Sequence, residues 1–272
     1  MTVALTGATG FLGGHVLRAL QARGRRVRVL VRRWPAVLGP CEVEITAGAL
    51  GDPGALRALV SGVTAVVHAA GAIKGPPERL ARVNVDGTRA LAEARRAVAP
   101  DARFVHVSTL AARAPELSAY ARTKLEAETA VRAAGGELRI LRPCAIYGPG
   151  DRETLKIFRL ADGPVQPMLN HAEARVCLVH VADAAEAIAH AVDAAEGGPD
   201  PVEIADDRRE GHAWREIAEA AALALGRRPR PVRIPAPALR MAGLLGDALD
   251  ALGLAHDAPT SGKMREILQA DW

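Results

Sequence analysis

The sequence predicts an α/β fold built on a doubly wound parallel sheet, and three observations favour it. A short strand at Thr2–Thr6 leads into three glycines spaced three residues apart, and an amphipathic stretch follows at His15–Arg23. Short β-branched strands then alternate with alanine-rich helices, as they do in parallel sheets. After Pro143 the alternation ends, and proline and glycine become frequent. We therefore expect a Rossmann-like sheet with a small C-terminal substrate lobe.

The individual elements follow the same patterns along the chain. After the first strand we expect strands at 27–31, 41–46, 64–68, 103–107 and 137–141, and helices at 54–60, 78–98 and 118–134. Asp52 and Pro53 are typical of an N-cap and a first helical residue. Later elements are a strand at 176–181, a proline-rich crossing segment at 229–237, and helices at 183–194, 212–225, 238–252 and 261–268. The expected dinucleotide-binding domain comprises 1–145 and about 176–195, and the expected substrate-binding lobe comprises 146–175 and 196–272.

Composition excludes several classes of function. The net charge is +4, but the basic residues are interspersed with acids, so no nucleic-acid partner is expected. Cys41, Cys144 and Cys177 are far apart in the sequence and have neither metal-ligand nor disulfide spacing, which favours a reducing compartment. The first strand begins at residue 2, and no apolar run is long enough to span a bilayer. We expect a cytoplasmic protein with a small-molecule substrate and no membrane partner.

The glycine-rich turn at Gly7–Gly13 predicts a dinucleotide site. Gly7 permits the tight turn, Gly10 lets the backbone approach a pyrophosphate, and Gly13 lets the helix pack closely. The helix N-terminus supplies N–H groups and a positive dipole for the anion. The residues between the glycines that are expected to contact the cofactor are Thr9, Phe11 and Leu12.

The end of the second strand indicates which dinucleotide is bound. Dinucleotide folds that use NAD place an acid there for the ribose hydroxyls, whereas Arg accommodates the 2′-phosphate of NADP. Here the strand ends in Arg32–Arg33, and no acid follows until Glu42. A guanidinium pairs bidentately with phosphate, so NADP (NADPH) is favoured over NAD. The alternative is that both arginines are merely solvated.

A Tyr-Lys pair and two strand-end hydroxyls predict chemistry rather than binding alone. Tyr120 and Lys124 are four residues apart and share a helical face. A neighbouring ammonium favours the phenolate, so the Tyr120 hydroxyl could serve as a general acid or base. Ser108 and Thr109 end a strand, and one of their hydroxyls could hydrogen-bond the substrate oxygen.

Together these motifs resemble the short-chain dehydrogenase/reductase superfamily, and more closely its extended branch, the NAD(P)-dependent epimerase/dehydratase family. The resemblance covers about two-thirds of the chain. It rests on TGATGFLG (6–13), HAAG (68–71), NVDGT (84–88), VST (107–109), YARTK (120–124), LRPCAIYGPGD (141–151) and HVAD (180–183), which occur in the family's order. It implies a Rossmann fold and an enzyme that transfers hydride with a nicotinamide cofactor.

The resemblance also implies roles for particular residues. Tyr120 would be the proton donor, and Lys124 would bind the nicotinamide ribose and lower the tyrosine pKa. The hydroxyl that contacts the substrate oxygen would be that of Thr109 rather than Ser108. The remaining cofactor contacts would come from Ala69, Ala70, Gly71 and Pro143. A homodimer would form through the helices at 78–98 and 118–134.

Two departures from the family pattern concern the adenine contact of the cofactor and the reaction. Gly48–Ala49 stands where an adenine-binding Asp is frequent, and Asp52 follows as a helix cap. Leu110–Ala111 follows Thr109 where the 4,6-dehydratases have an acidic pair, so dehydration is disfavoured. We expect an NADP-dependent carbonyl reductase or alcohol dehydrogenase for a rather apolar substrate. The alternatives are a nucleotide-sugar epimerase and a non-catalytic NADPH-binding structural or sensor protein.

Several nearby residues have structural interpretations. Asn84 in this position is expected to support the fold, and Cys144 to be a small buried apolar residue near the site. Packed or hydrogen-bonded roles are expected for three sheet histidines, which are His68, His106 and His180.

Overall fold

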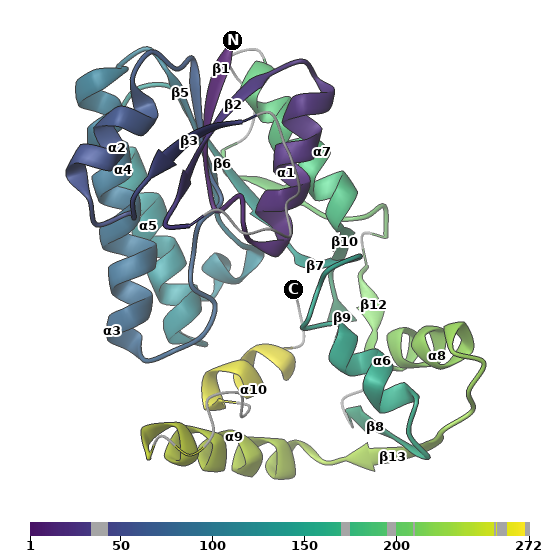
Figure 1. Cartoon of the computed structure of the whole chain (residues 1–272). Helices are drawn as coiled ribbons and strands as arrows, with labels where there is room; N and C mark the ends of the chain where they lie inside the picture. Colours follow the sequence, from purple (N-terminus) through teal and green to yellow (C-terminus); the bar gives the residue numbers. More distant parts are fainter. Residues whose placement is uncertain are drawn as a thin grey trace. The chain divides into compact units, whose positions relative to one another are not determined.

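The structure is a computed structural model of the whole chain, shown in Figure 1. It describes residues 1–33, 43–169, 175–194, 200–208, 210–252, 254 and 260–269. The chain divides into two compact units, which we describe separately. Unit 1 comprises Met1–Pro115, Tyr120–Pro143 and His180–Ile204, and unit 2 comprises Glu116–Ala119, Cys144–Val179 and Ala205–Trp272.

Unit 1 contains a seven-stranded parallel sheet. Its strands are β1 (Thr2–Thr6), β2 (Arg26–Val31), β3 (Glu44–Ala47), β4 (Ala65–His68), β5 (Arg103–Val107), β6 (Leu138–Pro143) and β11 (Val202–Ile204). The order across the sheet is β11-β6-β5-β4-β1-β2-β3, and Val3 pairs with Val27 on one side and Ala65 on the other. This order reverses between β1 and β4, so the predicted doubly wound parallel sheet is confirmed. The edge strand β11 was not predicted, and residues 41–42 of the predicted third strand lie outside the described residues.

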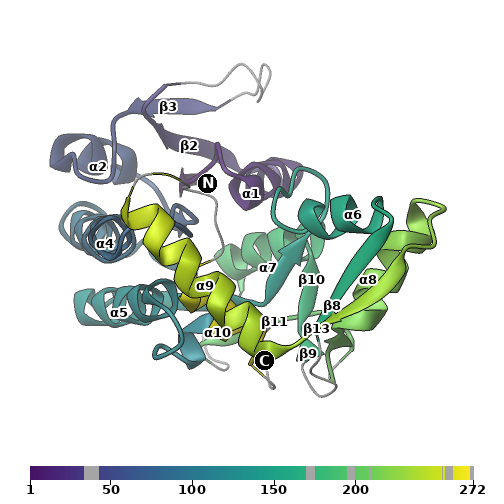
Figure 2. The ribbon, with the colours of Figure 1, turned by 90° about the horizontal axis from the view of Figure 1, so that it is seen from below.

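Helices cover both faces of this sheet (Figure 2). One face is covered by α1 (Phe11–Ala22) and α7 (Val181–Asp193), and the other by α2 (Pro53–Val60), α4 (Gly87–Val98) and α5 (Ala119–Ala134). Successive residues of β1 serve opposite faces: Leu5 packs in the cluster of Leu17 and Ile188, whereas Ala4 packs in the cluster of Leu59 and Leu91. Burial on both faces explains why the strands are continuous aliphatic runs.

The predicted helix at 78–98 is divided into three segments. It begins as α3 (Pro77–Leu80), widens into a π-helical segment at Ala81–Asp86, and continues as α4. The amide of Gly87 donates to Arg82 O, five residues back. Single-turn π segments are frequent at functional sites, and this one carries the buried Asn84. Periodicity predicts helix here but does not distinguish the wider turn.

Unit 2 combines helices with two-stranded sheets. Its helices are α6 (Leu155–Ala161), α8 (Trp214–Ala224), α9 (Ala236–Ala251) and α10 (Ser261–Ile267). The proline-rich segment predicted to be a crossing contains a strand, β13 (Arg230–Ile234), which pairs in parallel with β8 (Val165–Leu169). Pro231 is tolerated because this sheet has two strands and each is an edge.

The strand predicted at 176–181 is broken at Cys177. β9 (Arg175–Val176) pairs with β12 (His212–Ala213), and β10 (Leu178–His180) pairs with β7 (Ala145–Tyr147). The break brings Cys177 beside Cys144, and their hydrogen bond, together with burial, raises the pKa of the Cys144 thiol. Two cysteines that are far apart in the sequence are thus neighbours in space, and they are not joined by a disulfide. Cys41 lies outside the described residues.

Candidate functional site

The glycine turn at the end of β1 is sterically closed to larger residues. Gly7 has a φ of +80°, and a Cβ there would lie 2.6 Å from Ala70 N. A Cβ on Gly13 would lie 1.9 Å from Gly7 O. Helix α1 begins at Phe11 with Gly10 as N-cap, and no side chain caps it. The turn therefore fits a dinucleotide pyrophosphate, which would bind at this helix N-terminus between Gly7 and Gly13.

A chain of hydrogen bonds holds the loop after β4 against this turn. Ala70 N donates to Thr6 Oγ1 (3.3 Å), which lies 2.7 Å from His68 Nδ1. On the other side of the ring, His68 Nε2 lies 2.8 Å from Thr88 Oγ1, which donates to Asn84 O at 2.5 Å. Since Thr88 uses its proton for Asn84, Nε2 must be the protonated nitrogen and Thr6 must donate to Nδ1.

His68 is therefore a fixed, neutral histidine. Burial, followed by the charge of Lys124, lowers its pKa to about 3. His106 stacks on it with ring centroids 5.6 Å apart, and burial lowers the pKa of His106 as well. Neither ring nitrogen of His106 has a hydrogen-bond partner in the described part of the chain. The third sheet-end histidine, His180, caps α7 by accepting from Ala182 N (3.3 Å).

Asn84 fixes the same loop from the π-helical segment. Its side chain accepts from Ala72 N (2.8 Å) and donates to Ala72 O (2.9 Å) and to Thr123 Oγ1 (3.1 Å). A Cβ on Gly71 would lie 3.3 Å from Asn84 Oδ1. Asn84 thus connects the cofactor-side loop at Ala69–Gly71 to helix α5, one residue before Lys124.

Lys124 is buried on α5, and its Nζ donates to Val107 O at 2.7 Å. Burial lowers its pKa to about 8, and the nearby Glu128 carboxylate opposes this shift. Tyr120 is one turn earlier on the same helix and is half-buried. Lys124 therefore lies at the end of β5, where the two predicted hydroxyl groups follow.

The two hydroxyls after β5 have different surroundings. Ser108 is buried and donates to Glu128 Oε1 at 2.5 Å. Thr109 is half-buried, and its Oγ1 accepts from Ala111 N (3.3 Å), which caps the 3-10 helix Leu110–Arg113. The Thr109 hydroxyl proton has no acceptor among the described residues, so Thr109 keeps a donor that Ser108 has used.

A buried ion pair, one helical turn after Lys124 on α5, was not predicted. Arg142 Nε and Nη2 lie 2.9 Å and 2.7 Å from the two oxygens of Glu128, and both side chains are largely buried. The bidentate contact raises the pKa of Arg142. The available signal was spacing, because Tyr120, Lys124 and Glu128 recur every four residues on one face of α5.

Arg32 and Arg33 lie exposed directly after β2. The nearby acids are occupied elsewhere: Glu44 pairs with Arg28 at 2.8 Å, and Asp52 caps α2 by accepting from Gly54 N and Ala55 N. Neither arginine has an ion pair among the described residues. The last predicted contact, Pro143, is buried at the end of β6.

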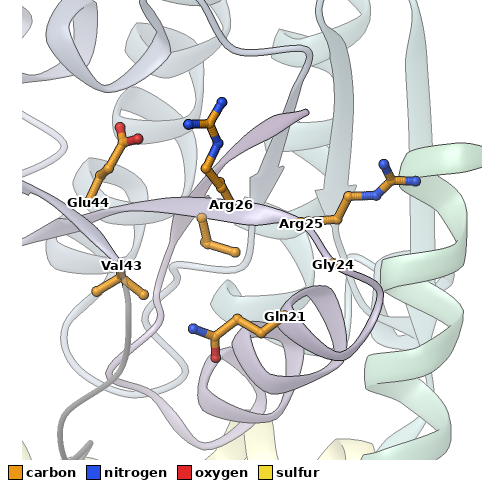
Figure 3. Close-up of a pocket in the computed structure, with 7 residues that line it drawn as sticks. Gln21, Gly24, Arg25, Arg26, Val43 and Glu44 are labelled. Atoms are coloured by element: carbon orange, nitrogen blue, oxygen red, sulfur yellow. The ribbon is translucent and has the colours of Figure 1, made fainter.

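A hollow of about 530 Å³ lies at the opposite end of β2 (Figure 3). In Figure 3 the Arg25 guanidinium turns toward α7, where it bonds Asp193 at 2.8 Å. The six residues of β2 place this hollow about 20 Å from Arg32. It is lined by Gln21, Gly24, Arg25, Arg26, Val27, Val43 and Glu44, none of which belongs to the candidate site.

Residues 3–205 match the NAD dependent epimerase/dehydratase family. The chain belongs to this family. A ceramide reductase from Caulobacter vibrioides is 48% identical over 274 residues, covering 99% of this chain and 85% of that protein. The resemblance seen in the sequence is thus confirmed, and the chain is an enzyme of the NAD(P)-dependent short-chain dehydrogenase/reductase type.

Solved structures have the same fold. MoeE5 in complex with UDP-glucose and NAD has a TM-score of 0.72 at 25% identity, covering 86% of this chain and 85% of that one. WbmH from Bordetella bronchiseptica in complex with NAD+ has a TM-score of 0.72 at 22% identity, again covering 86% and 85%. No helix among the described residues is long and apolar enough to cross a membrane.

Proposed function

We propose that this chain is an NADPH-dependent reductase of a ketone carried by a long-chain lipid of the ceramide type. The observation that carries the proposal is the 48% identity to a ceramide reductase along 99% of the chain. Nicotinamide hydride reduces ketones and aldehydes, whereas an amide carbonyl resists it. The reducible group would therefore lie on the long-chain base and not on the acyl linkage.

The proposed reaction adds hydride to the carbonyl carbon and a proton to the carbonyl oxygen. When bound, NADPH supplies the hydride and leaves as NADP+. Tyr120 donates the proton, and the phenolate that remains is favoured by the Lys124 ammonium on the next helical turn. The free hydroxyl proton of Thr109 is suited to donate a hydrogen bond to the oxygen as charge develops there.

The residues proposed to hold the cofactor come from five segments of unit 1. The turn at 7–13, with Thr9, Phe11 and Leu12, receives the pyrophosphate, and the loop Ala69–Gly71 is held against it. Lys124 would bind the ribose, and Pro143, which ends β6, would contact the nicotinamide. Arg32 and Arg33 have no ion pair among the described residues and are suited to the 2′-phosphate. Unit 2 would supply the substrate-binding lobe.

The proposal is tested with a ceramide-type ketone dispersed in detergent micelles, following the loss of NADPH absorbance in single turnovers. Tyr120→Phe is expected to slow the reaction about 10²–10⁴-fold with NADPH affinity unchanged, because only the proton-donating oxygen is removed. Thr109→Val is expected to slow it with unchanged affinity, whereas Thr129→Val, an exposed hydroxyl on α5, is the matched control. Wild-type rates in Tyr120→Phe would overturn the mechanism.

A second candidate is nucleotide-sugar epimerisation, supported by the likeness to MoeE5 with UDP-glucose and NAD. The two reactions differ in their redox balance. A reductase consumes one NADPH for each alcohol formed, whereas an epimerase returns the hydride and shows no net oxidation. Incubation with UDP-glucose and either cofactor, followed by chromatography of the sugar, distinguishes them.

A further inference from the structure

Helix α9 exposes its large apolar residues. Met241, Leu244 and Leu245 are between 57% and 61% exposed, and Ala248 and Leu249 continue the same stripe at helical spacing. Leu252 and Leu254, which follow the helix, are 71% and 70% exposed. An amphipathic helix of a soluble domain normally turns such a stripe toward its own core.

Small residues fix this orientation of α9. The face turned inward carries Gly243 and Gly246, which are buried. A Cβ on Gly243 would lie 2.8 Å from Ser261 Cα and 2.9 Å from Met264 Cγ of α10, and Ser261 N donates to Asp247 at 3.1 Å. Figure 1 shows α10 alongside α9. Because only a glycine face permits this close approach, the leucine stripe must face outward.

Unpaired positive charge adjoins the stripe. β13 runs directly into α9, and this stretch carries exposed arginines that have no ion pair among the described residues. Arg227, by contrast, pairs with Asp162 at 2.8 Å. Asp247 of α9 is turned toward α10. These arginines are Arg230, Arg233 and Arg240, and Arg228 lies two residues before β13.

We propose that β13 and α9 form a docking surface for an anionic lipid bilayer. The leucine stripe enters the boundary between headgroups and acyl chains, and the arginines contact lipid phosphates, as in interfacial amphipathic helices. The inference rests on the proposed function, since a ceramide-type ketone resides in a bilayer and must be reached there. A twofold contact with a second copy is disfavoured because it would bring two sets of unpaired arginines together.

The same surface is tied to the segment that precedes Tyr120. Glu266 of α10 accepts from Ser118 Oγ at 2.5 Å, and Arg265 Nε donates to Leu117 O at 2.8 Å. Helix α5 begins at Ala119, one residue later. Docking through α9 would therefore stabilise the pair formed by α9 and α10. Helix α10 in turn binds Leu117 and Ser118, which directly precede the segment of the proposed proton donor.

This surface departs from the expectation of no membrane partner. That expectation depended on the lack of an apolar run long enough to span a bilayer, and no described helix is long and apolar enough to do so. A helix that lies in the interface needs only one exposed apolar face, and the 16 residues of α9 provide it. Sequence hydropathy does not distinguish an exposed stripe from a buried one.

The experiment is co-sedimentation of the full chain with vesicles of phosphatidylcholine, with and without phosphatidylglycerol. We expect binding to the anionic vesicles to be at least about tenfold tighter and to weaken with salt. The double variant Leu244→Gln/Leu245→Gln should lose binding to both, and Arg233→Gln/Arg240→Gln should lose only the preference for phosphatidylglycerol. Leu223→Gln, an 81% exposed leucine on α8 of the same unit, is the matched control.

The outcomes separate docking from the proposed reaction. The leucine double variant should keep turnover of a short-chain soluble ketone and lose turnover of the vesicle-embedded ketone. Unchanged vesicle binding in this variant would overturn the docking surface, as would failure of the wild-type chain to bind, or a change from dimer to monomer as its only effect. Vesicle binding without turnover of any lipid ketone would instead refute the proposed function.

Discussion

Helices α1 and α9 are both built from glycines and large aliphatic residues, yet they bury different parts of themselves. Helix α1 buries Leu17 and Leu20 in the core of unit 1 together with Gly13. Helix α9 buries Gly243 and exposes its leucines. An apolar stripe thus predicts a helix with one apolar face. The close contacts of the glycines determine whether that face is buried or exposed.

The arginines on the strands of the two units differ in whether they form ion pairs within the chain. Strands β2, β5 and β6 of unit 1 each carry an arginine bound to a glutamate, and the Arg142–Glu128 pair is buried. Strand β13 of unit 2 carries Arg230 and Arg233 with no ion pair among the described residues. These three sheet arginines are bound within unit 1, whereas we propose that the arginines of β13 bind a partner.

The largest expected effect on stability is at the buried ion pair. Glu128→Ala leaves Arg142 without its bidentate partner in a site where the arginine is 13% exposed, so we expect a loss of about 3–5 kcal/mol in unfolding free energy. The exposed pair of unit 2, Arg227–Asp162, provides the contrast: Asp162→Ala should cost at most about 0.5 kcal/mol. Urea unfolding followed by circular dichroism measures both, and equal costs would contradict the comparison.

Truncating a leucine should cost much more stability on α1 than on α9. Leu17→Ala removes a side chain that is 1% exposed and leaves a cavity under α1, which should cost about 2–5 kcal/mol. Leu245→Ala trims a side chain that is 61% exposed and should change the free energy by less than about 0.5 kcal/mol. Thermal and urea unfolding of both variants provide the measurement. A large loss in Leu245→Ala would mean that the stripe has a partner within the chain.

Much of the fold could be predicted from the sequence because its signals are local. The glycine turn, the aliphatic strands and the Asp52–Pro53 cap each specify nearby backbone, and the sheet and helices of unit 1 follow from them. β11 and β13 were missed because three- and five-residue edge strands leave no periodicity. The π-helical turn at Ala81–Asp86 was missed because its pattern matches that of an ordinary helix.

The candidate site was predictable only where residues recur at fixed spacing. Tyr120 and Lys124 share one helix, so their relation is visible in the sequence. The Ser108–Glu128–Arg142 network joins β5, α5 and β6, and its partners are 14 and 20 residues apart. Cys144 and Cys177 likewise come into contact from positions that are far apart in the sequence, so their contact has no signal in the sequence. The homodimer and the NADP preference stay predictions.

The buried ammonium of Lys124 should make stability depend on pH. Its pKa is about 8 in the folded chain, below the ordinary 10.5 of an unfolded lysine. Between pH 8 and 10.5 the unfolded chain retains a proton that the folded chain has released, so stability rises with pH in this window. The gain relative to Lys124→Met should be on the order of 3 kcal/mol.

Unfolding by urea at several pH values in that window, for both proteins, measures the difference. A constant offset between the two would show that the Lys124 pKa is not lowered. Reductase turnover should fall above pH 8 in the wild-type chain, because the ammonium that favours the Tyr120 phenolate is lost.

The smallest effect concerns Arg32, a sheet-end arginine of unit 1 with no ion pair among the described residues, like those of β13. If its partner is the 2′-phosphate, Arg32→Ala should weaken NADPH binding by about 1–3 kcal/mol and leave NADH binding unchanged. Arg26→Ala, an exposed arginine at the other end of β2, is the matched control and should change neither. Fluorescence titration of both cofactors tests this, and NADH binding as tight as NADPH binding in the wild-type chain would refute the preference.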